Sequence, residues 1–464
     1  MSAAPAEAPL ARLKRLLARR FLRDTATLQV AALFNSAGNL LSTVVLAFVL
    51  GAHEQGRYYV ALALYGLLWF LLSQGPVSAT VSQIAAARAR GLSDKIAPWL
   101  AFLAKAYLAI GVALSVLGWF ALPLIARTWV SSPGTALAEA LEEARWAWWL
   151  TATPLLELPR VVASAALQGT RRMFPFAQIE NAHEAVRVFL VIVGAFLADS
   201  AAGAILGSLA ASAIGSIVAI ELYRGARRAD PAGLPGIRAI AGHVRDVPLA
   251  RGLPLGLKLG LVRSVDALAT QVLPTLILGL WGSKDWVAYL RIAQRILNVP
   301  LMMMQGISRN LLPALSELAG LKDMRRFRET FVRASVATGL LISSGLIVSL
   351  PLVHWAVGLA FPHDYQRPVT TIALILLPGF VVMSFSIAND TFYLVTNTLK
   401  AGVVLCLVGL VVNTAVVALS ARLWPTFGVA IGLSFTMATA TMHYVYAWWW
   451  FRNQRRLAPA AGPG

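Results

Sequence analysis

A face of polar and basic side chains runs along one predicted helix in the second half of the chain. Its members follow one another at intervals of 4, 3, 4, 3 and 4 residues, namely Arg291, Arg295, Asn298, Met302, Gln305 and Arg309. At about 100° of rotation per residue, this spacing places all six on one side of a helix. Arg291 and Arg295 would repel each other unless an anion or water lay beside them. The face therefore predicts a hydrated or anion-binding surface, because arginine forks match the oxygens of a phosphate.

Similar polar faces occur in three further apolar segments. They are Thr153, Glu157, Arg160, Ser164, Gln168 and Arg171 in one segment, Arg263, Asp266 and Thr270 with Lys258 in the second, and Asn35, Asn39 and Ser42 in the third. Four segments of the chain thus combine an apolar surface with one polar stripe.

The composition of the chain identifies the surroundings of these faces. Of 464 residues, 58% are hydrophobic and 13% are charged, which is about half the charged share of an average soluble domain. Apolar runs of about 20 residues recur, and this length crosses a bilayer as a helix. The excess of 40 Lys and Arg over 21 Asp and Glu reports orientation in such a chain, so no nucleic acid is expected as a partner. We predict an all-α polytopic membrane protein.

Twelve transmembrane helices in two six-helix lobes around a central cavity are predicted. The helices are expected at 27–50, 57–83, 97–126, 144–168, 178–198, 201–223, 253–281, 286–315, 331–360, 368–396, 400–421 and 425–450. The resulting domains are a cytoplasmic basic amphipathic segment at 1–26, an N-lobe at 27–224, a cytoplasmic basic linker at 225–252, a C-lobe at 253–451 and a cytoplasmic tail at 452–464. Both termini are placed in the cytoplasm because the connections on their side hold most of the Lys and Arg residues.

The polar faces should line the cavity between the lobes. A charge at the centre of a bilayer costs ~2.5–3.5 kcal/mol on a translocon-type scale, so lipid would not tolerate these faces. Their surplus of positive charge suits an anionic substrate. The candidate substrate-binding residues are Arg160, Lys258, Arg263, Arg291, Arg295, Asn35, Asn39 and Asn298.

Acidic residues in the predicted helices are candidates for coupling transport to protons. They are Glu157, Asp266 and Asp390. An arriving anion would compete for Arg160 or Arg263, take the arginine from its neighbouring acid and let that acid bind a proton. Alternatively, the i,i+3 pairs Glu157–Arg160 and Arg263–Asp266 only hold helices in place. That reading accounts poorly for the excess of cations, because eight cations in the predicted helices face about four acids.

The chain lacks the usual signatures of an enzyme. Cys406 is the only cysteine, and the six histidines are scattered singly. The sequence contains no Walker A loop, Asp-x-Asp motif or nucleophile elbow. We therefore expect no catalytic residue, no metal and no cofactor. Energy for transport would come from an ion gradient, the membrane potential or consumption of the product.

Several stretches, by their order and spacing, point to one family. They are LGAHEQGRYYVALALYGLLWFLLSQGPVSATVSQIAAARARG, SAALQGTRRMFPFAQIENAHEAVRVFLVIVGAFLA, GLPLGL, YLRIAQRILNVPL and NLLPALSEL. Together they resemble the bacterial polysaccharide flippases of O-antigen type, which belong to the multidrug/oligosaccharidyl-lipid/polysaccharide exporter superfamily.

The resemblance implies a transporter of the bacterial cytoplasmic (inner) membrane. It would flip a polyprenyl-diphosphate-linked oligosaccharide repeat unit from the cytoplasmic to the outer leaflet by alternating access, for the biosynthesis of surface polysaccharide such as lipopolysaccharide. The basic faces would meet the diphosphate, and the sugars would occupy the aqueous cavity. Membrane lipids and other polysaccharide-assembly proteins are the further partners that this function implies.

Two other functions compete with this one. A multidrug exporter of the same superfamily would move organic cations and favour an acidic cavity, which the surplus of arginine argues against. A membrane enzyme of polysaccharide assembly would need a sizeable loop outside the membrane for sugars and catalytic groups. The longest predicted loop on the outer side, at 127–145, is short for that purpose.

Thiol labelling tests the predicted topology. Cysteines introduced at Ser132, Ser200 and Ser283 should react in intact cells with a membrane-impermeant maleimide, because these positions lie in the outer connections. Cysteines at Ser93 and Asp323 should stay unlabelled until the cells are opened. Labelling at position 93 in sealed cells would contradict the twelve-helix map.

Overall fold

The computed structural model describes most of the chain. The described residues are 9–72, 74–129, 135–231, 233–252, 264–265, 267–302, 311, 315, 318, 323–396 and 398–457. Within these ranges the chain is helical and contains no strand. The predicted all-α polytopic class is confirmed.

The helices of the first half form one bundle. Its elements are α1 (Pro9–Leu72), α2 (Gln74–Ala89), η1 (Ser93–Lys95), α3 (Ile96–Trp129), α4 (Thr135–Leu150), α5 (Thr153–Leu156), α6 (Leu158–Gly169), α7 (Met173–Ala198) and α8 (Ala201–Ala229). The connection that follows contains α9 (Ile237–His243) and η2 (Leu249–Arg251).

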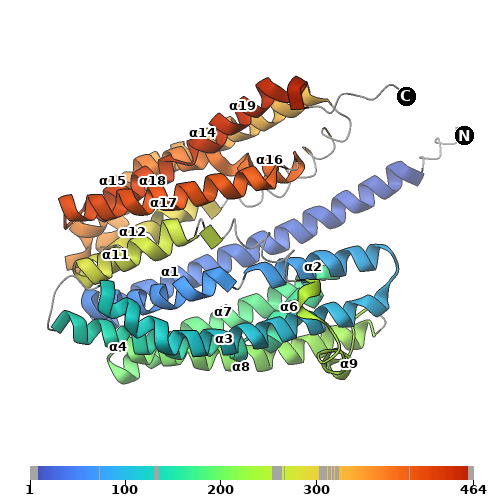
Figure 1. Ribbon diagram of the computed structural model, residues 1–464, viewed down its shortest axis with the longest axis horizontal. Coiled ribbons are helices and arrows are strands. Elements are labelled where there is room, and N and C mark those ends of the chain that lie inside the picture. Colours follow the sequence, from blue (N-terminus) through green and yellow to red (C-terminus); the bar gives the residue numbers. More distant parts are fainter. Residues whose placement is uncertain are drawn as a thin grey trace, which may run out of the picture.

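The helices of the second half form the other bundle. They are the π-helix η3 (Leu268–Val272), α11 (Leu273–Trp281), α12 (Lys284–Met302), α14 (Met324–Ala360), α15 (His363–Ser384), η4 (Phe385–Ala388), α16 (Asn389–Val395), α17 (Leu399–Leu423), α18 (Gly428–Ala438) and α19 (Thr441–Leu457). In Figure 1 the blue-to-green and yellow-to-red bundles lie side by side, with both termini at one end of the long axis. The opposite end, where α11 ends and α12 begins, is called the far end below.

Helix α1 contains two crossings of the membrane rather than one. Gly51 has φ 68 and ψ 177, a backbone conformation that glycine adopts at no steric cost. The chain reverses there, since the buried Gln55 amide donates to the carbonyl oxygen of Thr43 at 3.0 Å. The two legs of α1 therefore match the first predicted helix and most of the second.

Seven described segments are long and apolar enough to span a membrane. They are Gln29–Phe70, Ser93–Thr128, Met173–Ala198, Ala201–Ala229, Met324–Ala360, His363–Ser384 and Lys400–Leu423. The first of these holds the two crossings of α1. The other predicted crossings consist of shorter helices, as in α18 and α19, or carry several charges, as in α12. Each of the twelve predicted intervals contains helix within the described part of the chain.

The fourth predicted helix, at 144–168, is not continuous. It is divided into α4, α5 and α6, and prolines stand at the start of α5 and of α6. Pro154 and Pro159 lack the backbone N–H that a continuous helix needs, so the helix breaks before each. The hydroxyl of Ser216 in α8 donates to the carbonyl oxygen of Leu156 at 2.6 Å. A neighbouring helix thus satisfies a backbone group that the break leaves without a helical partner.

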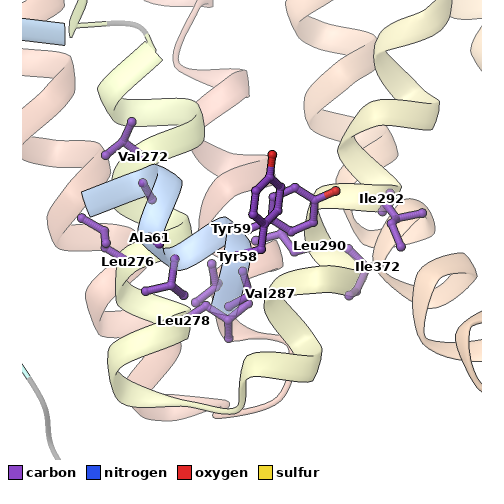
Figure 2. Packing of buried hydrophobic residues seen from close by; sticks show 14 of the residues in the cluster. Tyr58, Tyr59, Ala61, Val272, Leu276, Leu278, Val287, Leu290, Ile292 and Ile372 are labelled. Atoms are coloured by element: carbon purple, nitrogen blue, oxygen red, sulfur yellow. The ribbon is translucent and has the colours of Figure 1, made fainter. Parts of the chain in front are cut away.

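The two bundles share one core of buried apolar side chains. It brings Tyr59 and Val60 of α1 together with Leu276 of α11 and with Val287 and Leu290 of α12. Figure 2 shows most of these side chains converging from the separate helices. Lipid tails are as apolar as leucine, so close packing rather than exclusion of water must hold such helices together in a membrane.

The bundles meet backbone to backbone at the far end. A Cβ atom on Gly56 would lie 1.9 Å from the carbonyl oxygen of Lys284, and one on Gly279 would lie 2.3 Å from Cγ2 of Val60. Small residues at these positions permit the close approach. Contact between the second leg of α1 and the hairpin of α11 and α12 therefore depends on glycine.

Alanine at position 56 should loosen this contact. Overpacking a tight interface costs about 1–3 kcal/mol, so Gly56→Ala should lower the midpoint of thermal unfolding in detergent. Gly345→Ala is the matched control, because nothing lies within 4 Å of the corresponding Cβ. The control should keep or slightly raise the midpoint. Equal midpoints for Gly56→Ala and the unaltered protein would contradict the close contact.

Candidate functional site

Arg295 connects the two bundles through the first leg of α1. Its Nη1 atom donates to the carbonyl oxygen of Asn39 at 2.7 Å and also to the hydroxyl of Thr43. Its guanidinium carbon lies 5.5 Å from the ring centroid of Tyr59. A cation over an aromatic face is attracted by the ring quadrupole. Arg295 thus lies where α12 meets both legs of α1.

Arg291 lies one turn before Arg295 and shares its aromatic neighbour. Its guanidinium carbon lies 5.7 Å from the ring centroid of Tyr59, and Nη1 donates to Oε1 of Gln294 at 3.3 Å. Among the described residues, neither arginine has a carboxylate within ion-pair distance. Two guanidinium groups therefore stand at the interface of the bundles with only neutral groups beside them.

Asn39 is held from both bundles. Its backbone carbonyl accepts from Arg295, and its side-chain oxygen accepts from Nη2 of Arg187 in α7 at 2.9 Å. Arg187 also forms an ion pair with Glu184 at 2.6 Å. The charge of Arg187 is therefore balanced, whereas the charges of Arg291 and Arg295 are not. The predicted residues Asn39, Arg291 and Arg295 come together here.

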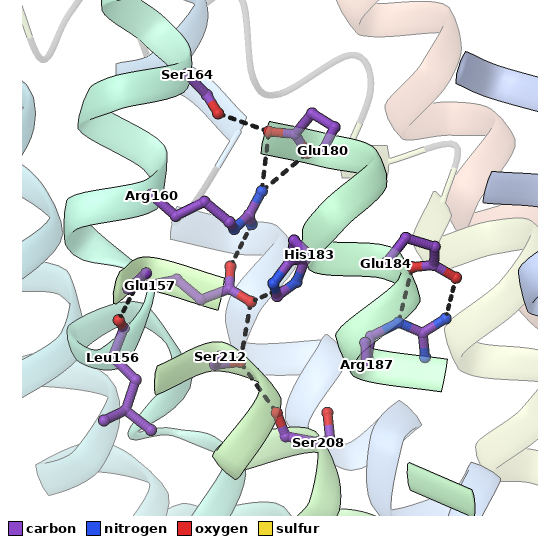
Figure 3. Close-up of polar contacts among 11 residues, drawn as sticks. Leu156, Glu157, Arg160, Ser164, Glu180, His183, Glu184, Arg187, Ser208 and Ser212 are labelled. Atoms are coloured by element: carbon purple, nitrogen blue, oxygen red, sulfur yellow. Dashed lines mark hydrogen bonds and ion pairs between the residues drawn. The ribbon is translucent and has the colours of Figure 1, made fainter. Parts of the chain in front are cut away.

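A second polar cluster lies within the first bundle (Figure 3). Arg160 pairs with Glu157 at 2.5 Å, as its i,i+3 spacing predicts, and also with Glu180 of α7 at 2.9 Å. Ser164 donates to Glu180 at 2.6 Å, and Nε2 of His183 lies 3.4 Å from Glu157. Arg160 thus faces two carboxylates. The acids that the sequence pattern singled out did not include Glu180.

Ser212 of α8 completes this cluster from a third helix. Its hydroxyl donates to Oε1 of Glu157 at 3.0 Å. Glu157 therefore accepts hydrogen bonds from α6 and α8 and lies beside His183 of α7. Such a network joins three helices of one bundle and leaves the other bundle free of it.

The remaining predicted residues are distributed around these clusters. Asn35 lies one turn before Asn39, and its buried side-chain oxygen has no hydrogen-bond partner in the described structure. Asn298 is half-buried on α12. Asp390 belongs to α16, but its side chain lies outside the description. Lys258, Arg263, Asp266, Gln305 and Arg309 also lie outside the described residues.

Sequence reasoning missed several members of these clusters. Tyr59 and Thr43 lie in apolar runs with no periodic polar pattern, so nothing distinguished them. The spacing of Glu184 and Arg187 did offer a signal, because they form an i,i+3 pair within a predicted helix.

The chemistry of the inter-bundle cluster favours anion binding. Guanidinium groups form paired hydrogen bonds with phosphate oxygens, and the tyrosine ring fixes their position from one side. The described residues contain no group of three or more His, Cys, Asp and Glu side chains that could hold a metal ion.

Comparison with known proteins identifies the family. The model of the family "Polysaccharide biosynthesis protein" matches residues 21–319, which is more than half of the chain. Compared with curated protein sequences, the chain finds no match. The resemblance to polysaccharide flippases is confirmed at the level of family.

Solved structures show the same fold at low sequence identity. An inward-facing multidrug resistance MATE family transporter of the MOP superfamily has a TM-score of 0.67 at 14% identity, over 92% of this chain and 96% of that one. The lipid II flippase MurJ in an inward closed conformation has a TM-score of 0.65 at 14% identity, over 90% of this chain and 86% of that one. A variant of the Vibrio cholerae MATE transporter VcmN has 0.63 at 14%, over 96% and 98%. The chain therefore belongs to the family of polysaccharide biosynthesis proteins and has the fold of the MOP-superfamily transporters.

Proposed function

We propose that this protein flips a polyprenyl-diphosphate-linked oligosaccharide repeat unit from the cytoplasmic to the outer leaflet by alternating access, for the synthesis of surface polysaccharide. The observation that carries the proposal is the pair Arg291 and Arg295, which lie at the interface of the bundles with no carboxylate partner in the described structure. A diphosphate would supply the missing negative charge.

The family supports the polysaccharide part of this proposal, and the fold supports transport. Lys258 and Arg263 would extend the basic surface, and Asn35, Asn39 and Asn298 would provide neutral hydrogen-bonding groups for the substrate. The proposed membrane is the bacterial inner membrane, with both termini in the cytoplasm and the far end outside. The partners would be the lipid-linked oligosaccharide, membrane lipids and other proteins of polysaccharide assembly.

Recorded contacts between the bundles favour closure at the far end in this conformation. They include Gly56 against Lys284 and Gly279 against Val60. With the far end outside, the site would open toward the cytoplasm, where the lipid-linked substrate is made. Substrate would then enter while the outer side is closed.

A multidrug exporter is the second candidate, because two of the structural matches are MATE transporters. Charge distinguishes the two functions. Organic cations need an acidic or aromatic site, whereas Arg291 and Arg295 would repel them. The inter-bundle cluster therefore favours the anionic substrate.

Removal of the arginine pair tests the substrate class. Arg291→Ala and Arg295→Ala should abolish surface polysaccharide in cells that depend on this protein, and lipid-linked repeat units should accumulate. Lysine at either position should restore export only in part, because lysine keeps the charge but loses the paired hydrogen bonds. Gel analysis of surface polysaccharide and extraction of the lipid-linked units provide the readouts.

The control for this experiment is Arg325→Ala, since that side chain is 91% exposed and pairs only locally with Glu329. It should leave export unchanged. Amounts of inserted protein must match, because Arg295 also holds α1. Normal polysaccharide in the double alanine variant would refute the anionic substrate.

We propose further that Glu157 couples transport to protons. A phosphate that takes Arg160 from Glu157 would leave that carboxylate beside the second acid, Glu180. Two neighbouring carboxylates disfavour double ionisation, so one of them would bind a proton. Asp266 with Arg263 is the parallel candidate in the second bundle, and Asp390 is the third coupling candidate.

The substitution Glu157→Gln tests this coupling. Glutamine keeps the shape and hydrogen bonding of the side chain but fixes it neutral. Export should continue and lose its response to external pH, measured as surface polysaccharide at two pH values. Glu221→Gln is the control, because Glu221 forms an exposed i,i+3 pair with Arg224. Reduced thermal stability with a retained pH response would instead assign Glu157 a structural role.

A further inference from the structure

A cluster of charged residues at the far end is separate from the site described above. Its members come from three helices, namely His53, Glu54 and Arg57 of α1, Glu139, Glu142 and Glu143 of α4, and Lys284 and Asp285 of α12. Helices α1 and α4 belong to the first bundle and α12 to the second. The cluster therefore crosses the interface at the end where the bundles touch.

Glu143 and Lys284 form the buried contact of this cluster. Nζ of Lys284 donates to Oε2 of Glu143 at 2.8 Å, with the two side chains 8% and 0% exposed. A buried charge is costly unless it is paired, so each group here depends on the other. The same residue, Lys284, offers its carbonyl oxygen to the closest backbone approach, at Gly56.

The other ion pairs of the cluster do not join the bundles in this way. Arg57 pairs with Glu54 and Glu142 and lies 4.5 Å from the ring centroid of Trp146, all within the first bundle. The contact of His53 with Asp285 does cross the interface, at 3.6 Å, but both side chains are about half exposed. Exposed pairs contribute little because water and salt screen them.

We propose that Glu143 and Lys284 are the latch that keeps the two bundles together at the far end. Separation of the bundles would pull the ammonium group away from its carboxylate and let water reach both. The pair therefore favours the closed arrangement as long as both charges are present. Arg57 stays with the first bundle, since its Nε lies 3.6 Å from the other oxygen of Glu143. This inference concerns the opening of the far end and does not depend on the substrate.

Thiol accessibility beneath the latch tests it. A cysteine at Val60, which is buried against Gly279, is introduced into a Cys406→Ser background. The rate of its reaction with a membrane-impermeant maleimide reports opening of the far end. Lys284→Ala and Glu143→Gln should raise this rate about tenfold, because a hydrogen bond between charged groups contributes that much to an equilibrium. Lys284→Arg should keep the slow rate.

Two controls separate a latch from a general loss of stability. Arg145→Ala removes an exposed ion pair with Glu142 in the same region but within one bundle, so the rate should not change. A second reporter cysteine at Ala147, buried in the first bundle, should remain unreactive in every variant. Faster labelling at both reporters would mean unfolding and would overturn the proposal.

A neutral pair provides the variant that is most certain to fold. Glu143→Gln combined with Lys284→Met removes both charges and leaves neither buried alone, a replacement that proteins commonly tolerate. Position 60 should still react faster than in the unaltered protein. An unchanged rate in this variant would show that packing, and not the ion pair, keeps the far end closed.

Discussion

An ionised side chain inside a membrane protein must be paired or hydrated, and the polar interior of this chain follows that constraint. Within the first bundle, Arg160 has two carboxylates and Arg187 has one. These groups join helices that stay together, so their charges can be neutralised permanently. Arg291 and Arg295 differ, because they lie between bundles and have aromatic and neutral groups beside them. Charge is left uncompensated where the two bundles meet.

The position of this uncompensated charge suits a protein with two relatively rigid bundles. A permanent ion pair across the interface would hold the bundles in one arrangement. Contacts through a backbone carbonyl and a hydroxyl, such as those of Arg295 with Asn39 and Thr43, are weaker and can be exchanged for an anion. The same physical rule explains the different character of the far end, where Glu143 and Lys284 are fully paired and buried. One interface thus contains an exchangeable contact and a strong one.

Backbone packing complements these electrostatic contacts. In a bilayer the helices gain little from burying apolar surface against each other, so close approach of small residues matters more. Gly56 and Gly279 allow α1 to approach α11 and α12 at the far end. Within the first bundle, a Cβ on Gly194 of α7 would lie 2.2 Å from the carbonyl oxygen of Gly203 in α8. Such contacts hold each bundle and their junction without any charge.

The amino-acid sequence by itself determined the class of the protein, the positions of its helices and the pairing of neighbours on one helix. The thickness of a bilayer sets the length of an apolar run, and helical periodicity brings Glu157 beside Arg160. Local periodicity also predicted that Arg291 and Arg295 share a face. It could not indicate the breaks that leave α4, α5 and α6 separate as clearly, although Pro154 and Pro159 mark them.

Only the tertiary structure decided which faces meet. Glu180 reaches Arg160, Arg295 reaches Asn39, and Lys284 reaches Glu143 from helices that are distant in the sequence. The rotation of each helix about its axis and its shift against its neighbours determine these contacts. Both depend on how whole helix surfaces pack, and no single stretch of sequence contains that information.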